Sequence, residues 1–176
     1  MQLDKFDEID RKAVIRSVEK SLDVSLSLVG RRKKWLRDDS GKTYWVLGGY
    51  GEWHGIPAEM MDAEAKNPTG GFIVVAIRHR SAIQIYIGPL KEVVANRGKL
   101  LRARKTTGDY QFTYRKRGTR IVIEQSPNSV LNQLVAFDYT EENRESDIKL
   151  DKALKLLENM SEEERSAFIE SKEYKN

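Results

Sequence analysis

The chain has 176 residues, no cysteine and a formal net charge of +4. Its length suits one domain with a substantial hydrophobic core. The lack of cysteine excludes disulfides, thiolate zinc sites and a cysteine nucleophile. No apolar stretch approaches the length of a membrane span and no apolar targeting segment opens the chain, so we expect a cytoplasmic protein with no membrane partner.

Charge is distributed unevenly along the chain. Residues 1–140 hold 24 basic against 16 acidic side chains, whereas residues 141–176 hold 7 against 11. A basic body is the usual electrostatic footprint of a partner that carries phosphates. The sequence therefore predicts a DNA-binding domain over residues 1–140 and an acidic, amphipathic helical tail over residues 141–176.

In chain order, apolar residues recur at helical spacing in some segments and form short β-branched runs in others. Helices are predicted at residues 7–27, 57–66, 90–104 and 128–137, with further helices after residue 140. Strands are predicted at residues 44–47, 72–77, 82–87, 109–117 and 119–124, the last four as two hairpins. This mixture predicts an α+β fold, with a small mixed or antiparallel sheet flanked by helices and a C-terminal helical tail.

One stretch concentrates glycines and large rings, and it reads Gly48-Gly49-Tyr50-Gly51-Glu52-Trp53-His54-Gly55-Ile56-Pro57. Glycine lets the backbone approach a ligand closely, and Tyr and Trp offer flat apolar faces with a polar atom. The stretch predicts a loop that grips a planar group. The alternative is that Tyr50 and Trp53 only stabilise a glycine-rich turn by hydrophobic packing.

Basic side chains cluster at several predicted loops and hairpin turns. They are candidates for contacts with the DNA backbone, because lysine and arginine neutralise phosphates and release counterions. Trp35 would serve as an anchor beside the first of these clusters, and the alternative for the clusters is ordinary solvated charge. The candidates are Arg31, Arg32, Lys33, Lys34, Arg37, Arg78, Arg80, Arg102, Arg104, Lys105, Arg115, Lys116 and Arg117.

Signals for catalysis are weak. The tripeptide Gly41-Lys42-Thr43 is not a P-loop, because the glycine required five positions earlier is replaced by Leu36. Asp62, Glu64 and Lys66 have the residue types of a metal-dependent nuclease, but they fall on a predicted surface helix where that chemistry needs a strand. We expect no catalytic residue, no metal ligand and no cofactor in this chain. A metal-dependent DNA nuclease and a protein-interaction module acting through the C-terminal helices remain alternatives.

The glycine-aromatic stretch resembles the N-terminal DNA-binding domain of McrB, from a modification-dependent restriction system. The shared pattern is Gly-aromatic-Gly, an aromatic two residues later and a nearby Ile-Pro, here Gly49 to Pro57. A glycine-led apolar strand at residues 71–77 and a second strand at residues 83–88 follow. About forty residues carry the match, and the rest agrees in the order of elements.

The resemblance implies that the domain binds double-stranded DNA and flips a methylated cytosine into a pocket, where Tyr50 stacks on the base. Ile77 falls on an aliphatic pocket-wall position, and Gly49, Gly51, Trp53 and His54 complete the expected base pocket. The family pattern has a tryptophan where this chain has Ala58, which changes the expected pocket shape. Cleavage or translocation in such a defence system would need a partner nuclease or NTPase subunit.

Overall fold

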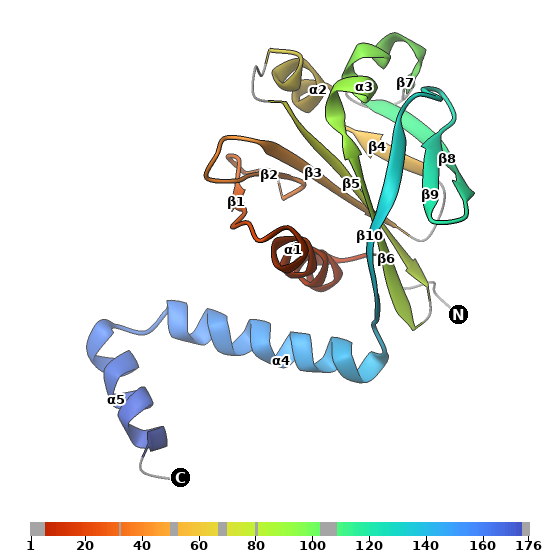
Figure 1. The fold of residues 1–176 in the computed structure, drawn as a ribbon. Coiled ribbons are helices and arrows are strands. Elements are labelled where there is room, and N and C mark those ends of the chain that lie inside the picture. Colours follow the sequence, from red (N-terminus) through yellow and green to blue (C-terminus); the bar gives the residue numbers. More distant parts are fainter. Residues whose placement is uncertain are drawn as a thin grey trace. The chain divides into compact units, whose positions relative to one another are not determined.

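The computed structural model describes residues 6–31, 33–49, 53–66, 70–79, 81–102 and 109–173, with the backbone alone for Trp53, Arg102 and residues 168–173. Its contacts divide the chain into two compact units, Met1–Tyr139 and Thr140–Asn176. The first unit is a mixed sheet with helices packed on it, and the second consists of two helices (Figure 1). The predicted α+β class with a C-terminal helical tail is therefore confirmed.

The strands described form one connected sheet in the order β1-β2-β3-β5-β6-β10-β9-β8-β4, with β7 also paired to β8. Among these pairs, β3 and β5 run parallel and the others antiparallel. Both predicted hairpins are confirmed, as β5–β6 and β8–β9. The bounds are β1 Ser27–Leu28, β2 Trp35–Arg37, β3 Thr43–Gly49, β4 Trp53–Ile56, β5 Gly71–His79, β6 Ala82–Pro89, β7 Leu101–Arg102, β8 Tyr110–Arg117, β9 Arg120–Ile123 and β10 Val130–Asp138.

Two apolar clusters form the core, and β3 and β5 contribute alternate residues to each. The first cluster contains Trp45 and Ile77 and includes side chains of α2 and α3. The second contains Tyr44 and includes side chains of α1. Because neighbouring strand residues point to opposite faces, the two clusters lie on opposite sides of the sheet. The helices are α1 Glu8–Leu22, α2 Ala58–Glu64, α3 Leu90–Ala95, α4 Glu141–Glu158 and α5 Glu162–Glu173.

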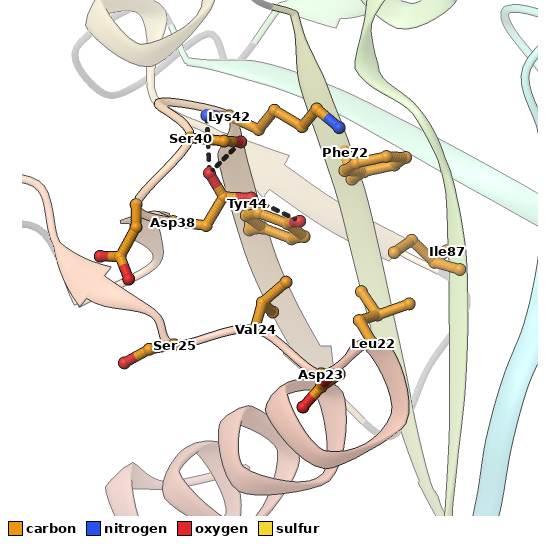
Figure 2. Close-up of a pocket in the computed structure, with 11 residues that line it drawn as sticks. Leu22, Asp23, Val24, Ser25, Asp38, Ser40, Lys42, Tyr44, Phe72 and Ile87 are labelled. Carbon is orange, nitrogen blue, oxygen red and sulfur yellow. Dashed lines mark hydrogen bonds between the residues drawn. The ribbon is translucent and has the colours of Figure 1, made fainter.

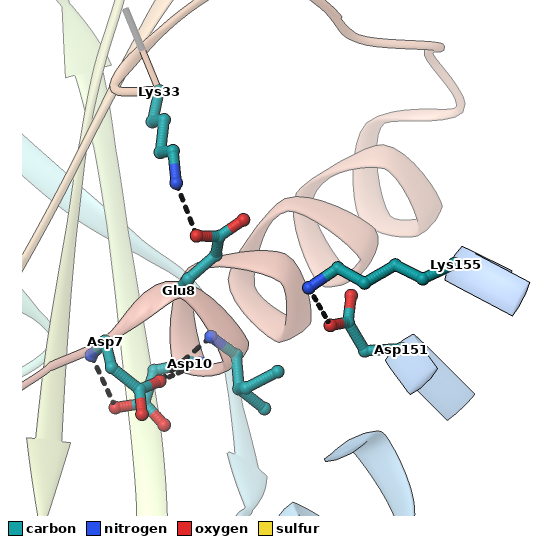
Figure 3. A network of polar contacts seen from close by, with 7 residues as sticks. Asp7, Glu8, Asp10, Lys33, Asp151 and Lys155 are labelled. Atoms are coloured by element: carbon teal, nitrogen blue, oxygen red, sulfur yellow. Dashed lines mark hydrogen bonds and ion pairs between the residues drawn. The ribbon is translucent and has the colours of Figure 1, made fainter. Parts of the chain in front are cut away.

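Helix α1 begins with a capping box. The Asp7 carboxylate accepts hydrogen bonds from the backbone nitrogens of Ile9 and Asp10, and the Asp10 carboxylate accepts one from the Asp7 nitrogen at 3.2 Å (Figure 3). The predicted end at residue 27 is wrong. Asp23 takes a left-handed conformation with φ 53°, which ends the helix, and Ser27 already pairs with Arg37 in the sheet.

The predicted helix over residues 90–104 is also too long. Helix α3 stops at Ala95, where the Asn96 side-chain amide donates to the backbone oxygen of Glu92 at 2.9 Å. A short 3-10 turn, Arg97–Lys99, follows, and the chain then enters β7. Asparagine and glycine favour turns over a continuing helix, and Asn96 and Gly98 both fall in this segment.

The predicted helix over residues 128–137 is wrong, because this segment is the strand β10 between β6 and β9. A register shift between Gln133 and Val135 interrupts its pairing with β6. Such a bulge lets consecutive side chains face the same side. Leu134 and Val135 accordingly both pack on the second cluster, whereas Leu131 joins the first. The bulge thus produces apolar spacing that resembles a helix.

The predicted glycine-aromatic loop is largely strand. Strand β3 continues through Gly49 and β4 begins at Trp53, so only residues 50–52 join the two strands. A β-carbon at Gly48 would lie 2.2 Å from the ring of Phe6, so this glycine makes room for the packed phenylalanine. The predicted helix after this stretch is confirmed as α2, with Pro57 at its N-cap.

Candidate nucleic-acid interface

The parallel pairing of β3 with β5 places Gly49 beside Ile77. The Ile77 side chain is 6% exposed and belongs to the first core cluster. The structure therefore brings together two residues of the expected base pocket, one at the end of β3 and one on β5. Tyr50 and Gly51 lie outside the described residues, and Trp53 is described by its backbone alone.

His54 follows this segment on β4 and is 5% exposed. Its ring stacks on Tyr114 with centroids 5.6 Å apart and lies 5.7 Å from the ring of Phe112, and both partners belong to the first core cluster. Strand β4 pairs with β8, which carries both of these aromatic residues. His54 and Ile77 therefore lie against the same apolar cluster, from strands at different places in the sheet.

Burial makes the His54 ring neutral near pH 7. Removal from solvent, with a smaller contribution from the positive charge of Lys34, lowers the pKa of His54 to about 4. Its buried Nε2 atom has no hydrogen-bond partner among the residues that the structure describes. A neutral imidazole can donate a hydrogen bond from one ring nitrogen and accept one at the other. His54 Nε2 therefore has hydrogen-bonding capacity that the described part of the chain does not use.

Two tryptophans also have a buried ring nitrogen without a hydrogen-bond partner in the described part of the chain. Trp35 and Trp45 are paired across β2 and β3, and the buried Nε1 atom of each has no hydrogen-bond partner within the described ranges. Trp35 is partly buried and packs against the first core cluster. Sequence analysis did not single out Trp45, Phe112 or Tyr114. Because Phe112 and Tyr114 alternate along β8, the sequence places them on one face of that strand. Their proximity to His54 depends on the pairing of β8 with β4, which is far away in the chain.

The prediction that Arg78 contacts DNA phosphates is wrong. Arg78 is 3% exposed, its Nη1 atom donates to Asp10 Oδ1 at 2.6 Å, and its guanidinium lies 5.2 Å from the ring centroid of Tyr139. Strand β5 continues through Arg78 to His79, so this arginine lies in the strand and not in the turn between the two predicted strands. The guanidinium connects β5 to α1 instead of reaching a ligand.

The hairpin of β8 and β9 presents the clearest group of exposed cations. Arg115, Lys116 and Arg117 are exposed at its end, where Gly118 takes a φ of +60° in the turn. Arg115 Nη2 donates to Glu124 Oε1 at 2.9 Å, and Lys116 Nζ donates to Gln84 Oε1 at 3.0 Å. Paired strands fix the geometry of this turn, as a phosphate contact requires.

A second group of exposed cations surrounds β2, namely Arg31, Lys33, Lys34 and Arg37. Lys33 forms an ion pair with Glu8 of α1 (Figure 3). Neighbouring atoms partly shield the ammonium group of Lys34, and this desolvation, followed by the charge of Arg11, lowers its pKa. Four other predicted phosphate contacts, Arg32, Arg80, Arg104 and Lys105, lie outside the described residues, and Arg102 is described by its backbone alone.

The acidic residues weighed as a nuclease site do not form one. Glu64 is 6% exposed and accepts a hydrogen bond from Thr43 Oγ1 at 2.5 Å, so it is not on the helix surface as predicted. Asp62 is exposed, with its carboxylate 3.7 Å from the guanidinium of Arg97. No group of three or more His, Cys, Asp or Glu side chains in the described ranges is placed to hold a metal ion.

Comparison of the chain with known protein families, with curated proteins and with solved structures gives no significant match. The resemblance to the McrB N-terminal domain thus depends on the motif residues themselves. Within the described part of the chain, no helix has both the length and the apolar character needed to cross a membrane.

Proposed function

We propose that this chain binds double-stranded DNA and reads a modified, methylcytosine-type base in a pocket beside residues 50–52. The observation that carries the proposal is the placement of Gly49, Ile77 and His54. Gly49 and Ile77 are neighbours on paired strands, and Ile77 and His54 both lie against the first core cluster. In this proposal, Tyr50 stacks on the base.

In such a site, the free energy gained by stacking offsets the cost of flipping the base. Moving a base out of the duplex costs a few kcal/mol, and stacking on an aromatic side chain returns about 1–3 kcal/mol per base. Ile77 supplies an apolar surface suited to a methyl group. His54 is neutral, so it supplies a hydrogen-bonding atom without placing a buried positive charge beside the base.

Exposed cations on the β8–β9 hairpin and around β2 support the sequence-independent part of binding. Each lysine or arginine that neutralises a phosphate releases condensed counterions and steepens the salt dependence of affinity. The chain would then act as the recognition module of a restriction or defence system. In this proposal, cleavage belongs to a partner nuclease or NTPase subunit.

A gel-shift panel tests this proposal. It compares duplexes that carry cytosine, methylcytosine or hydroxymethylcytosine in one sequence, each at two salt concentrations. We expect tighter binding to a modified duplex at both salt concentrations and weaker binding to all duplexes at the higher one. Equal affinity for the three duplexes would exclude modified-cytosine recognition, and no binding at low salt would exclude a DNA-binding role.

Exposed leucines on α4 favour a second candidate function, interaction with another protein. Leu150 is 46% exposed, Leu154 48% and Leu156 67%. Apolar side chains this exposed on an amphipathic helix commonly mark a contact surface. Sedimentation of the full chain over a range of concentrations tests self-association through this surface. Assembly that Leu154→Lys abolishes would support it, whereas a monomer at every concentration would argue against self-association.

A further inference from the structure

A cavity of about 540 Å³ lies between the C-terminal end of α1, the turn that joins β2 to β3, and the sheet (Figure 2). Its volume falls within the range of small-molecule sites. All of its lining residues belong to the unit Met1–Tyr139. Nothing in the proposed DNA function uses this cavity.

The inner wall of the cavity is apolar and aromatic. Tyr44 and Phe72 lie on neighbouring strands with ring centroids 5.3 Å apart, and Leu22 and Ile87 extend this surface. Tyr44 belongs to the second core cluster, on the face of the sheet covered by α1, and Phe72 packs against that cluster. Ile77 belongs to the first cluster. The cavity is therefore on the opposite face of the sheet from the candidate base pocket.

The mouth of the cavity carries a fixed carboxylate. Asp38 Oδ1 accepts hydrogen bonds from Ser40 Oγ at 2.7 Å and from the backbone nitrogen of Lys42 at 3.0 Å, and its Oδ2 accepts one from the Tyr44 hydroxyl at 3.1 Å (Figure 2). Partial burial would raise the pKa of Asp38, but these hydrogen bonds outweigh it and lower the pKa below its ordinary value. Asp38 is therefore an anion held in one orientation.

The tyrosine in this network stays protonated. Burial, together with the hydrogen bond to Asp38 and its charge, raises the pKa of Tyr44 to about 12. Its hydroxyl hydrogen is directed at Asp38 and its ring, 2% exposed, packs beside Phe72, so Tyr44 holds the carboxylate in place and the more exposed Phe72 offers the aromatic surface. The wall thus combines an aromatic surface with a neighbouring negative charge, the arrangement that attracts organic cations.

The charge around the cavity is negative, although the body of the chain is basic. Among the described lining residues, Asp23, Asp38 and Asp39 are acidic and Lys42 is the one cation, with its side chain extending toward Phe72 in Figure 2. Helix α1, 15 residues long, ends at this cavity, and the C-terminal end of a helix carries partial negative charge. Phosphates would be repelled here and cations attracted.

We propose that this cavity binds an organic cation with an apolar stem, an alkylguanidinium or alkylammonium group. The apolar stem packs on Phe72, Leu22 and Ile87, and the charged end lies among the carboxylates at the mouth. The group is either a free amine or the side chain of an arginine or lysine in a peptide. This inference does not depend on DNA binding.

Isothermal titration and chemical-shift mapping of the full chain test the proposal. The probes are N-acetyl-arginine methylamide, its neutral isostere N-acetyl-citrulline methylamide, and agmatine. We expect both cations to bind and to shift signals of Phe72 and Ile87, with the citrulline compound binding much more weakly. Equal binding of the citrulline compound, or no binding of either cation at millimolar concentrations, would overturn the proposal.

Two variants and a matched control locate the binding. Asp39→Asn removes an exposed carboxylate from the mouth and should weaken cation binding roughly two- to five-fold, as expected for one exposed ion-pair partner. Lys42→Met removes the competing cation and should strengthen binding. Asp62→Asn removes an exposed carboxylate outside the cavity and should leave binding unchanged. Equal effects of Asp39→Asn and Asp62→Asn on cation binding would contradict the assignment of the binding site to this cavity.

A further titration distinguishes the two sources of the cation, a free amine and a basic side chain of a peptide. A short peptide with one central arginine is compared with the same peptide carrying citrulline, and both are compared with agmatine. Tighter binding of the arginine peptide than of agmatine assigns the cavity to a basic segment of a protein partner. Tighter binding of agmatine assigns it to a free amine, and failure of both cations contradicts the proposal.

Discussion

Arg78 on β5 and Asp10 on α1 form an ion pair with an N–O distance of 2.6 Å, and their side chains are 2% and 0% exposed. They are separated by 68 positions in the sequence. Asp10 also completes the capping box of α1, so one carboxylate both stabilises the helix start and pairs with the sheet. A residue predicted to bind DNA is thereby a link between the two layers of the fold.

Breaking this pair should strongly destabilise the domain. Arg78→Met leaves the Asp10 carboxylate buried without its cation, and we expect a loss of about 3–5 kcal/mol in the free energy of unfolding. Urea denaturation measures the change. The double variant Arg78→Met/Asp10→Leu should recover part of the loss, because it removes both charges. A loss below about 1 kcal/mol for Arg78→Met would contradict the structural role.

Gly88 should not tolerate a side chain. A β-carbon at Gly88 would lie 2.7 Å from the backbone oxygen of Val130 on the neighbouring strand β10, and that oxygen cannot move without disturbing the sheet. We expect Gly88→Ala to cost about 1–3 kcal/mol of stability in thermal or urea unfolding. Gly98→Ala is the matched control, since no atom lies within 4 Å of its β-carbon. Similar midpoints for the two variants would be inconsistent with this packing.

His54 should make stability depend on pH. Its pKa in the folded chain, about 4, lies below its ordinary value of 6.5, so protons bind more tightly to the unfolded chain. The stabilisation is fully present above pH 6.5 and is lost as pH falls toward 4, by at most about 3 kcal/mol. His54→Phe should reduce the slope of stability against pH in this window. An NMR titration of the His54 ring that gives an ordinary pKa would contradict the expectation.

Arg117 should contribute to DNA affinity but not to the preference for modified over plain duplexes. It is exposed at the end of the β8–β9 hairpin, so Arg117→Ala should weaken binding to modified and plain duplexes alike and reduce the slope of log affinity against log salt by about 1. Fluorescence anisotropy over a salt series measures both quantities. Lys20→Ala, at an exposed position of α1, is the control. An unchanged slope for Arg117→Ala would remove the hairpin from the interface.

Local sequence patterns predicted the elements whose apolar residues follow a regular period. The β5–β6 hairpin, the β8–β9 hairpin and α2 follow from β-branched runs, turn residues and a proline at a helix start. Strand β10 was mistaken for a helix because a bulge moves Leu134 and Val135 to one face. The early end of α1 depends on a left-handed Asp23, a conformation that the local pattern does not encode.

Less of the candidate site could be predicted. The motif placed Gly49, His54 and Ile77 in one site, but the burial of His54 depends on β8, more than fifty residues away in the chain. The pairing of Arg78 with Asp10 and of Glu64 with Thr43 likewise needs the folded chain. Isolated charges in a sequence do not reveal whether they meet a ligand or a buried counter-charge.

The most direct test of the central proposal is the ratio of Kd for plain and methylcytosine duplexes, measured for wild type, Tyr50→Phe and Tyr50→Ala. Loss of stacking should lower the preference of Tyr50→Ala by roughly 5- to 150-fold, or to no preference at all, while weak salt-sensitive binding remains. Tyr50→Phe should keep the preference, because it keeps the ring. A wild-type preference that survives unchanged in Tyr50→Ala would contradict base recognition by this segment.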